Sequence, residues 1–410
     1  MLPYFAGVTM KQHYHAIIIG GGASGLMCAI AAKRKNPRMS VAIIEKNDRV
    51  GKKLLSTGNG RCNLTNANVA PDKYVGSGAK KLVGAVLQKY NVQSLLDYFG
   101  TLGLLTSKDS EGRYYPLSRQ ASTVLDVLRF NCEALGVEMI CGEAVTKVAA
   151  EKGFSVTTKQ NVYTAKKLVI AAGSPAAPKL GGSRSEALFL GHKAAPFSAA
   201  LCPVTVRSDI LKSLKGLRVQ AEVKLESDKG VVKAERGEVQ FNEDNLSGIC
   251  VFDLSLFAKP DMRISLDLLP DISEKELYNI LIKNKKLFAN HNIDNLLTGI
   301  LQKRIAQAVL KSAGVKDFSR SCSALGDGEL GSIAKTAKSL WFTVTGNAGF
   351  DRAQACRGGV LCGQIDPVTM QSLLVKNLYF CGEALDVCGE CGGYNLHFAF
   401  AGGIIAGESL

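Results

Sequence analysis

The sequence lacks the features that would assign it to a specialised class of protein. It has no run of about eighteen apolar residues, which a membrane-spanning helix needs, and no block of five like charges. Its first ten residues contain neither a basic leader nor a long apolar stretch, and no internal repeat or low-complexity segment is present. These absences predict a globular, soluble, cytoplasmic protein with no membrane span.

The composition further limits the class of protein and the kind of ligand. With 410 residues, of which 46% are hydrophobic, the chain can fill two or three cores. Its twelve cysteines are spread through expected strands and helices, so we expect most of them to be reduced and buried. The net charge of +14 favours an anionic ligand or partner, such as a dinucleotide, a carboxylate, a membrane headgroup or a nucleic acid, without choosing among them.

A strand, a glycine-rich turn and a helix are predicted near the start of the chain. The apolar run "HAIIIG" is followed at once by "GGASGLMCAIAAKRKN", whose apolar residues have helical spacing. Gly20, Gly22 and Gly25 form a G-x-G-x-x-G in the turn. Glycine there lets the chain bend, lets a pyrophosphate approach the backbone and lets the helix pack close to the strand. The N-terminus of the helix would then face the phosphates.

A second strand completes this dinucleotide-binding pattern. The segment "MSVAIIEK" ends near Glu45, twenty positions after Gly25, where a carboxylate can accept hydrogen bonds from the hydroxyls of an adenosine ribose. An acid at this position argues against a 2′-phosphate. The pattern therefore predicts FAD or NAD rather than NADP in this site.

Two further segments favour FAD over NAD. Residues 377–407, "NLYFCGEALDVCGECGGYNLHFAFAGGIIAG", read as a strand, a Gly-Glu turn, a glycine-rich loop and an apolar helix. In two-domain flavoproteins such a late strand returns to the first sheet, and the next helix points its N-terminus at the flavin. The other segment, "KKLVIAAGSPAAP", is a strand that runs into the turn where such proteins cross toward the cofactor.

At these segments the chain resembles the HI0933-like flavoproteins, the NAD(P)/FAD-dependent oxidoreductases of the bile-acid reductase (BaiN-like) group. The resemblance covers nearly the whole chain. It rests on "IIIGGGASGLMCAIAA", "RVGKKLLSTGNGRCNLTN", "LVIAAGSPAAPKLGGS", "AQACRGGV" and "GEALDVCGECGGYNLHFAFAGG". The sequence departs from the family pattern at "NLSGI", at "AAGS" and at the two cysteines of "CGEC". These departures bear on the geometry of the substrate site rather than on FAD binding.

The resemblance implies an α/β fold with a discontinuous Rossmann-type FAD-binding domain, an inserted β-rich domain and a helical subdomain. We expect the FAD-binding domain to comprise 13–194 and 350–410, and the inserted substrate domain to span 195–349. Within the insert, "VQAEVKLESDKGVVKAERGEVQF" alternates as antiparallel strands do, and "SEKELYNILIKNKKLF" is helical. Ser273 and Glu276 have the spacing of a capping box at the start of that helix.

The resemblance also implies where FAD would bind, with Lys53 and the loop "TGNGRCN" along the pyrophosphate and ribityl chain. The cofactor-binding residues that it implies are Gly20, Gly22, Ala23, Ser24, Gly25, Glu45, Lys46, Lys53, Thr57, Gly58, Asn59, Gly60, Arg61, Cys62, Asn63, Val145, Ala172, Gly173, Gly382, Glu383, Asp386, Gly393, Tyr394, Asn395 and Leu396.

Catalytic residues are less well defined. Tyr394, His397 and Arg357 are candidates for a proton donor or for a partner of a carboxylate or enolate, although a structural role is favoured for each. Arg61 is also a candidate, with a cofactor-binding role favoured. We expect no metal site, because no second cysteine pair has suitable spacing. The "CGEC" pair, Cys388 and Cys391, is either a redox dithiol or, as we favour, packing.

The resemblance implies reduction of an activated C=C bond of an enone in a hydrophobic small molecule, a 3-oxo-Δ4 or Δ4,6 bile-acid or steroid intermediate. Only one G-x-G-x-x-G is present, so NAD(P)H would bind transiently as the electron donor. One alternative is reduction of uridine to dihydrouridine in ribosomal RNA, which is the same chemistry on a conjugated carbonyl and suits the basic net charge. A second alternative is oxidation of a small amine, without NAD(P)H.

Overall fold

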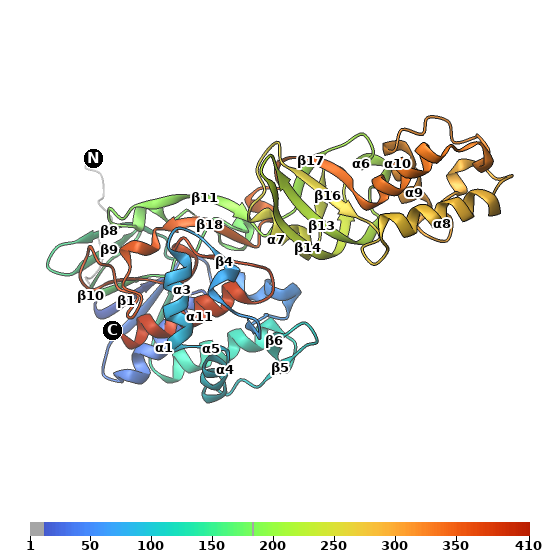
Figure 1. The fold of residues 1–410 in the computed structure, drawn as a ribbon. Coiled ribbons are helices and arrows are strands. Elements are labelled where there is room, and N and C mark those ends of the chain that lie inside the picture. The colour runs from blue at the N-terminus through green and yellow to red at the C-terminus, as the bar shows by residue number, and fades with distance from the viewer. Residues whose placement is uncertain (1–11, 183) are drawn as a thin grey trace, which may run out of the picture. The chain divides into compact units, whose positions relative to one another are not determined.

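The computed structural model describes residues 12–182 and 184–410, which form two compact units (Figure 1). The first unit combines the chain up to Ala200 with Phe350–Leu410, and the second is Leu201–Gly349. The sequence placed the first boundary after residue 194, but Ala194–Ala200 forms strand β11, which pairs with β18 (Ala355–Val360) inside the first unit. The expectation about a leader concerns residues 1–10, which lie outside the described residues.

A seven-stranded sheet forms the centre of the first unit, with the order β7-β2-β1-β10-β9-β8 and with β19 also pairing with β10. Its strands are β1 (Gln12–Ile19), β2 (Val41–Glu45), β7 (Glu138–Cys141), β8 (Val145–Ala150), β9 (Phe154–Thr158), β10 (Val162–Ile170) and β19 (Leu378–Phe380). The pairs β2–β7, β1–β2, β1–β10 and β10–β19 are parallel, whereas β8, β9 and β10 pair antiparallel. The return of the late strand β19 to the first sheet confirms the predicted α/β fold with a discontinuous domain.

Helices pack around this sheet. They are α1 (Ala23–Lys35), α2 (Lys52–Leu55), α3 (Ala79–Lys89), α4 (Val92–Thr101), α5 (Ala121–Ala134) and α11 (Tyr394–Glu408). Helix α1 packs against β1 and β2, and α3 and α4 pack against α11. Helix α11, from the end of the chain, lies beside α1 (Figure 1). The glycines of α11 make this contact possible, because a Cβ at Gly403 would lie 2.4 Å from the Ser24 carbonyl oxygen and one at Gly407 would lie 2.2 Å from that of Cys28. The contact fixes the N-termini of two buried helices within one unit.

Short strands complete the first unit. A three-stranded sheet joins β3 (Thr65–Asn66), β6 (Arg113–Pro116) and β5 (Thr106–Lys108), and a two-stranded one joins β4 (Tyr74–Val75) to β20 (Cys388–Gly389). The second pairing ties the glycine-rich loop before α11 to the first part of the chain.

The second unit is a closed antiparallel barrel with a helical part, which confirms the predicted β-rich insert and helical subdomain. Its strands are β12 (Val204–Arg207), β13 (Arg218–Ser227), β14 (Gly230–Phe241), β15 (Asn245–Ser247), β16 (Arg263–Asp267) and β17 (Leu340–Asn347). Its helices are α6 (Leu211–Leu214), α7 (Ile249–Ser255), α8 (Glu274–Leu287), α9 (Lys303–Ser312) and α10 (Asp327–Lys338).

Local sequence explains two features of this unit. In β13 alternate residues Ala221, Val223 and Leu225 are fully buried, as the period of two requires for a strand with one face on a core. Helix α8 begins with the predicted capping box, in which the Ser273 hydroxyl accepts from the Glu276 amide at 3.2 Å and the Glu276 carboxylate accepts from the Ser273 amide at 2.9 Å.

Within the described part of the chain, no helix is long and apolar enough to cross a lipid bilayer.

Candidate functional site

A cavity of about 350 Å³ lies in the first unit, where β1, β2 and β10 end. In a parallel sheet these carboxyl ends are where ligands bind. Eight of the predicted cofactor-binding residues line it, namely Gly20, Gly22, Glu45, Lys46, Lys53, Val145, Ala172 and Gly173. Residues that are more than a hundred positions apart in the sequence therefore share one cavity.

The glycine turn forms one wall of this cavity. Gly20 has a φ of +106°, and a Cβ there would lie 2.4 Å from the Ala171 carbonyl oxygen. A Cβ at Gly25 would lie 1.9 Å from the Gly20 carbonyl oxygen. The glycine-rich loop therefore packs against the start of α1 so closely that position 25 has no room for a side chain. A Cβ at Gly22 would meet no atom within 4 Å. The turn thus leaves an open space in front of the backbone, as a bound pyrophosphate requires.

The N-terminus of α1 faces the same region without a side-chain cap and without an acidic residue in its first turn. Ala23 and Ser24 supply amides at this end. Because the first amides of a helix lack intrahelical acceptors and carry partial positive charge, this end can bind an anion.

Glu45 is held in a fixed orientation at the end of β2. Its side chain is 7% exposed, and one carboxylate oxygen accepts from the Gly21 amide at 2.8 Å. The other accepts from the backbone amide of Asn47 at 2.9 Å and from its side chain at 2.6 Å. Next to it, burial lowers the pKa of Lys46. The carboxylate therefore lies at the cavity with its position set by backbone donors, as the predicted ribose contact requires.

Lys53, Ser174 and Glu383 form a polar network, also in the first unit. The Lys53 ammonium lies 2.5 Å from one carboxylate oxygen of Glu383, and the Ser174 hydroxyl donates to the same oxygen at 2.8 Å. The preceding Gly382 has a φ of +67°, and a Cβ there would lie 2.7 Å from the Ser24 hydroxyl. This network joins the early and late segments that the sequence assigned to the cofactor.

The loop "TGNGRCN" winds tightly because it contains four left-handed residues, Gly58, Asn59, Gly60 and Cys62. The side chain that follows, Asn63, is 7% exposed, and its Oδ1 has no hydrogen-bond partner among the described residues.

This buried oxygen lies against the start of α11, since a Cβ at Gly393 would come within 2.7 Å of it. Gly393 provides no side-chain cap to α11. A buried acceptor without a donor costs about 1–3 kcal/mol, so a ligand that carries a donor would stabilise this place. Together with the space at the glycine turn, this unsatisfied oxygen shows that the residues present fit a dinucleotide cofactor such as FAD.

Seventeen of the twenty-five predicted cofactor-binding residues do not line the cavity. Arg61 is exposed, and its Nε donates to the Gly58 carbonyl oxygen at 3.1 Å. Cys62 is fully buried, and burial raises the pKa of its thiol to about 12. The remaining predicted positions outside the lining are Ala23, Ser24, Gly25, Thr57, Gly58, Asn59, Gly60, Asn63, Gly382, Glu383, Asp386, Gly393, Tyr394, Asn395 and Leu396.

Two of these polar side chains hold loops together. The Asp386 carboxylate accepts from the amides of Gly358 at 2.9 Å and Ser77 at 2.7 Å. The Asn395 side chain accepts from the Gly389 amide at 2.8 Å and donates to its carbonyl oxygen at 2.9 Å. They shape the backbone around α11, and these partners could not be predicted from the neighbouring residues.

His397 is enclosed by the protein with both ring nitrogens in contact with other residues, which favours the structural role over that of a proton donor. The side chain is fully buried. Its Nδ1 lies 2.7 Å from the Thr65 hydroxyl and its Nε2 lies 3.0 Å from the Tyr90 carbonyl oxygen. Burial lowers the pKa of the ring to about 4, so it is neutral at pH 7. Both nitrogens are engaged, and His397 links α11 to the first part of the chain.

A pH dependence of stability follows from this burial. Because the folded pKa of His397 lies below its usual value near 6.5, the unfolded chain takes up a proton first as the pH falls. The stability contribution is therefore present at pH 7 and lost between about pH 6.5 and pH 4. We expect the free energy of unfolding to fall by about 2 kcal/mol from pH 7 to pH 5 through this residue. Urea unfolding followed by circular dichroism should show that component vanish in His397→Gln and persist in His13→Gln, an exposed control. An unchanged dependence in His397→Gln would exclude the explanation.

The other catalytic candidates have structural contacts. Tyr394 is 6% exposed, its ring meets that of Tyr74 edge-on at 6.1 Å, and its carbonyl oxygen accepts from the Tyr74 hydroxyl at 2.8 Å. Arg357 is half-buried on β18, where its charge lowers the pKa of the Cys388 thiol by less than burial raises it.

The "CGEC" cysteines do not have the environment of a reactive dithiol. Cys388 is fully buried, and burial raises its thiol pKa well above the usual value, which opposes the thiolate form that reacts. Neither Cys388 nor Cys391 forms a disulfide. Within residues 12–182 and 184–410, no group of three or more His, Cys, Asp or Glu side chains could hold a metal ion.

Sequence reasoning missed part of the cavity. The additional charged or polar lining residues are Asn47, Lys52, Glu143, Thr146, Arg184 and Ser185. Arg184 and Ser185 lie in "KLGGSRSEAL", just after the turn "AAGSPAAP". Their polar side chains, so close to this turn, could have indicated that they line the cavity. Glu143 carried no such signal, because only the pairing of β7 with β2 brings the residues after β7 to the cavity.

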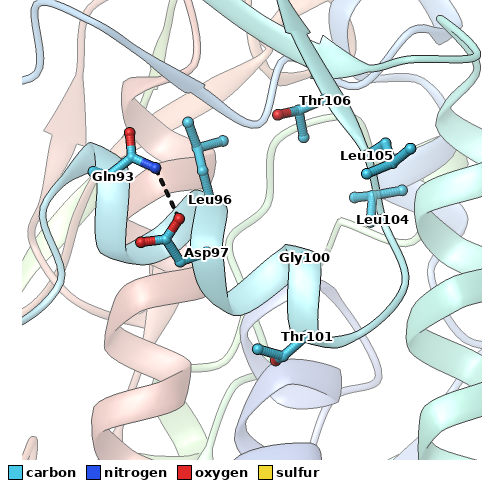
Figure 2. A pocket seen from close by; sticks show the side chains of 8 residues that line it. All are labelled: Gln93, Leu96, Asp97, Gly100, Thr101, Leu104, Leu105 and Thr106. Carbon is cyan, nitrogen blue, oxygen red and sulfur yellow. Dashed lines mark hydrogen bonds between the residues drawn. The ribbon is translucent and has the colours of Figure 1, made fainter.

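A second hollow lies apart from this cavity, between α4 and the residues leading to β5 (Figure 2). It measures about 540 Å³, and Leu96, Leu104 and Leu105 line it with the hydrogen-bonded pair Gln93 and Asp97, 2.8 Å apart (Figure 2). None of the predicted site residues lines it.

A family model and similar proteins match nearly the whole chain. The HI0933-like protein Rossmann domain family matches residues 14–409. A 3-dehydro-bile acid delta(4,6)-reductase from Clostridium scindens is 33% identical over 409 residues, covering 96% of this chain and 98% of its own. A ribosomal RNA dihydrouridine synthase from Escherichia coli is 29% identical over 408 residues, covering 97% and 98%. A 3-ketosteroid-Δ4-(5α)-dehydrogenase structure from Rhodococcus jostii RHA1, in complex with 4-androstene-3,17-dione, has 15% identity and a TM-score of 0.48, with 99% and 98% coverage.

Proposed function

Because the chain belongs to the HI0933-like family of flavoproteins, we propose that it is an FAD-dependent oxidoreductase that uses NAD(P)H to reduce an activated C=C bond of an enone. The substrate that we propose is a 3-oxo-Δ4 or Δ4,6 bile-acid or steroid intermediate. The observation that carries this proposal is the 33% identity, over 96% of the chain, to a relative named for that reaction.

The residues of the first unit would hold FAD along the cavity. The turn at Gly20 and Gly25 and the N-terminus of α1 would receive the pyrophosphate, and Glu45 would accept from the ribose hydroxyls. Asn63 would use its unsatisfied oxygen to accept from a donor of the cofactor. When bound, FAD supplies the hydride chemistry that the side chains lack.

The side chains and helix ends of the protein would position the reactants and set the charge around them. Lys53 keeps the Glu383 carboxylate paired, so that the network does not place an isolated negative charge in the site. The N-terminus of α11, with no acidic residue in its first turn, favours negative charge in front of it. Such a fixed positive end would stabilise charge that develops there during the reaction.

The test is a steady-state assay of the purified protein with NADH or NADPH and a 3-oxo-Δ4,6 bile acid. We expect consumption of the nicotinamide and a product that has gained two hydrogens at the double bond. Nicotinamide consumption only with oxygen, or peroxide release with small amines, would contradict the enone proposal and favour an oxidase.

A second candidate is reduction of uridine in ribosomal RNA. Two observations favour it, a relative of that name at 29% identity over 97% of the chain and the net charge of +14, which suits a phosphate-rich partner. Incubation of the reduced protein with ribosomal RNA that lacks dihydrouridine, followed by nucleoside mass spectrometry, distinguishes this candidate. Formation of dihydrouridine would establish it, and an unreacted bile acid in parallel would exclude the first proposal.

A further inference from the structure

Two arginines contact one buried tyrosine in the first unit, outside the cavity. Tyr115 lies on β6 and is 2% exposed. The guanidinium carbon of Arg61 lies 5.1 Å from its ring centroid, and that of Arg119 lies 4.7 Å from it. Two positive charges are therefore held at one ring, although they repel each other.

Neither guanidinium has a carboxylate partner in the part of the chain that the structure describes. Acidic residues are present close by in the sequence, but they are used by another arginine. Arg113 lies 2.8 Å from the Asp109 carboxylate and 2.8 Å from that of Glu111. The pair at Tyr115 is thus left with positive charge that an anion would neutralise.

Left-handed residues stand at one of the two arginines and on both sides of the other. Arg119 has a φ of +56°, and Arg61 lies between Gly60 at +82° and Cys62 at +56°. A left-handed conformation is unfavourable for residues with a side chain, and residues in this state concentrate at ligand-binding places. Arg119 and Cys62 adopt this conformation where the two guanidinium groups meet the Tyr115 ring.

We propose that Arg61 and Arg119 together bind the carboxylate of the substrate. The inference rests on the proposed function, because a bile acid carries a carboxylate on its side chain, far from the enone ring. A guanidinium presents a planar fork that matches a carboxylate, and its ring contact with Tyr115 keeps that fork oriented. Arg61 is exposed and Arg119 is half-buried, so both are open to a ligand from solvent.

The test compares two ligands that cannot be reduced, cholate and its uncharged methyl ester, binding to the flavin-loaded protein. Titration calorimetry would give the affinity of each ligand for the unchanged protein and for Arg61→Met, Arg119→Met, Arg61→Lys and Arg129→Met. Arg129 is the matched control, since it contacts the Phe130 ring at 4.7 Å but has Glu133 as a partner at 2.8 Å.

We expect the unchanged protein and Arg129→Met to bind cholate about tenfold more tightly than the ester, as loss of a charged hydrogen bond implies. Each methionine variant at the pair should lose this preference while its affinity for the ester is unchanged, and Arg61→Lys should keep part of it. A preserved flavin spectrum in all variants would show that folding is intact.

Other outcomes overturn one claim or the other. Equal affinity for cholate and the ester in the unchanged protein, or no binding of either, would contradict the carboxylate site. So would loss of affinity for a uridine-containing RNA hairpin, instead of cholate, in the two methionine variants. A cholate preference that depends on the pair, together with no reduction of any enone, would contradict the proposed function and leave the carboxylate site standing.

Discussion

Gly25→Ala is expected to abolish flavin binding and to cost about 3 kcal/mol of unfolding free energy or more. The new Cβ would lie 1.9 Å from the Gly20 carbonyl oxygen, which is backbone and cannot move without opening the turn. The turn and α1 would have to separate, and both the packing and the proposed pyrophosphate place would be lost. Absorbance near 450 nm in the purified protein and its urea unfolding curve measure the two effects.

Two further alanine variants separate packing from ligand contact. Gly22→Ala meets no atom within 4 Å, so it should fold normally, yet its methyl group would stand in the open space before the turn and weaken flavin binding at least about tenfold. Gly100→Ala in α4 also meets no atom and should bind flavin normally, with a helix more stable by up to about 1 kcal/mol. Normal flavin content in Gly22→Ala would contradict the placement of the cofactor at this turn.

Lys53→Met is expected to destabilise the first unit by about 2 kcal/mol and to weaken flavin binding. It leaves the Glu383 carboxylate, whose side chain is 19% exposed, without its cation. Removing one partner of a buried pair costs about 3–5 kcal/mol, and the partial exposure of both groups reduces this figure. Denaturation and titration of the flavin-free protein with FAD measure both effects.

The double variant Lys53→Met/Glu383→Gln should recover part of the lost stability, because a neutral amide can still accept from the Ser174 hydroxyl. Lys89→Met is the control for loss of a lysine, since its partner Glu408 is 2.8 Å away and the lysine is 43% exposed. That pair should contribute less than about 1 kcal/mol. A double variant no more stable than Lys53→Met would show that the uncompensated charge is not the cause.

The sequence predicted the features that depend on local backbone chemistry. The glycine turn, Glu45 at the end of β2 and the capping box at Ser273 follow from neighbouring residues, and the structure has each of them. The return of β19 to the sheet is a long-range feature, and it was predicted because residues 377–407 have the strand, turn, loop and helix order of two-domain flavoproteins.

The remaining contacts could not be predicted because their partners are far apart in the sequence. His397 is neutralised by burial against Thr65 and Tyr90, more than three hundred positions away. Arg61 was expected to bind the cofactor, and its contact with the Tyr115 ring, more than fifty positions away, could not be anticipated. A residue type can indicate a kind of ligand, whereas only the fold decides which neighbour it meets.

The most direct test of the central claim is an anaerobic half-reaction. The flavin-loaded protein is first bleached near 450 nm with NADPH or NADH, and one equivalent of a 3-oxo-Δ4,6 bile acid is then added. We predict that the absorbance returns and that the bile acid is recovered with one C=C bond saturated. A flavin that bleaches but stays reduced in the presence of the bile acid would contradict the account.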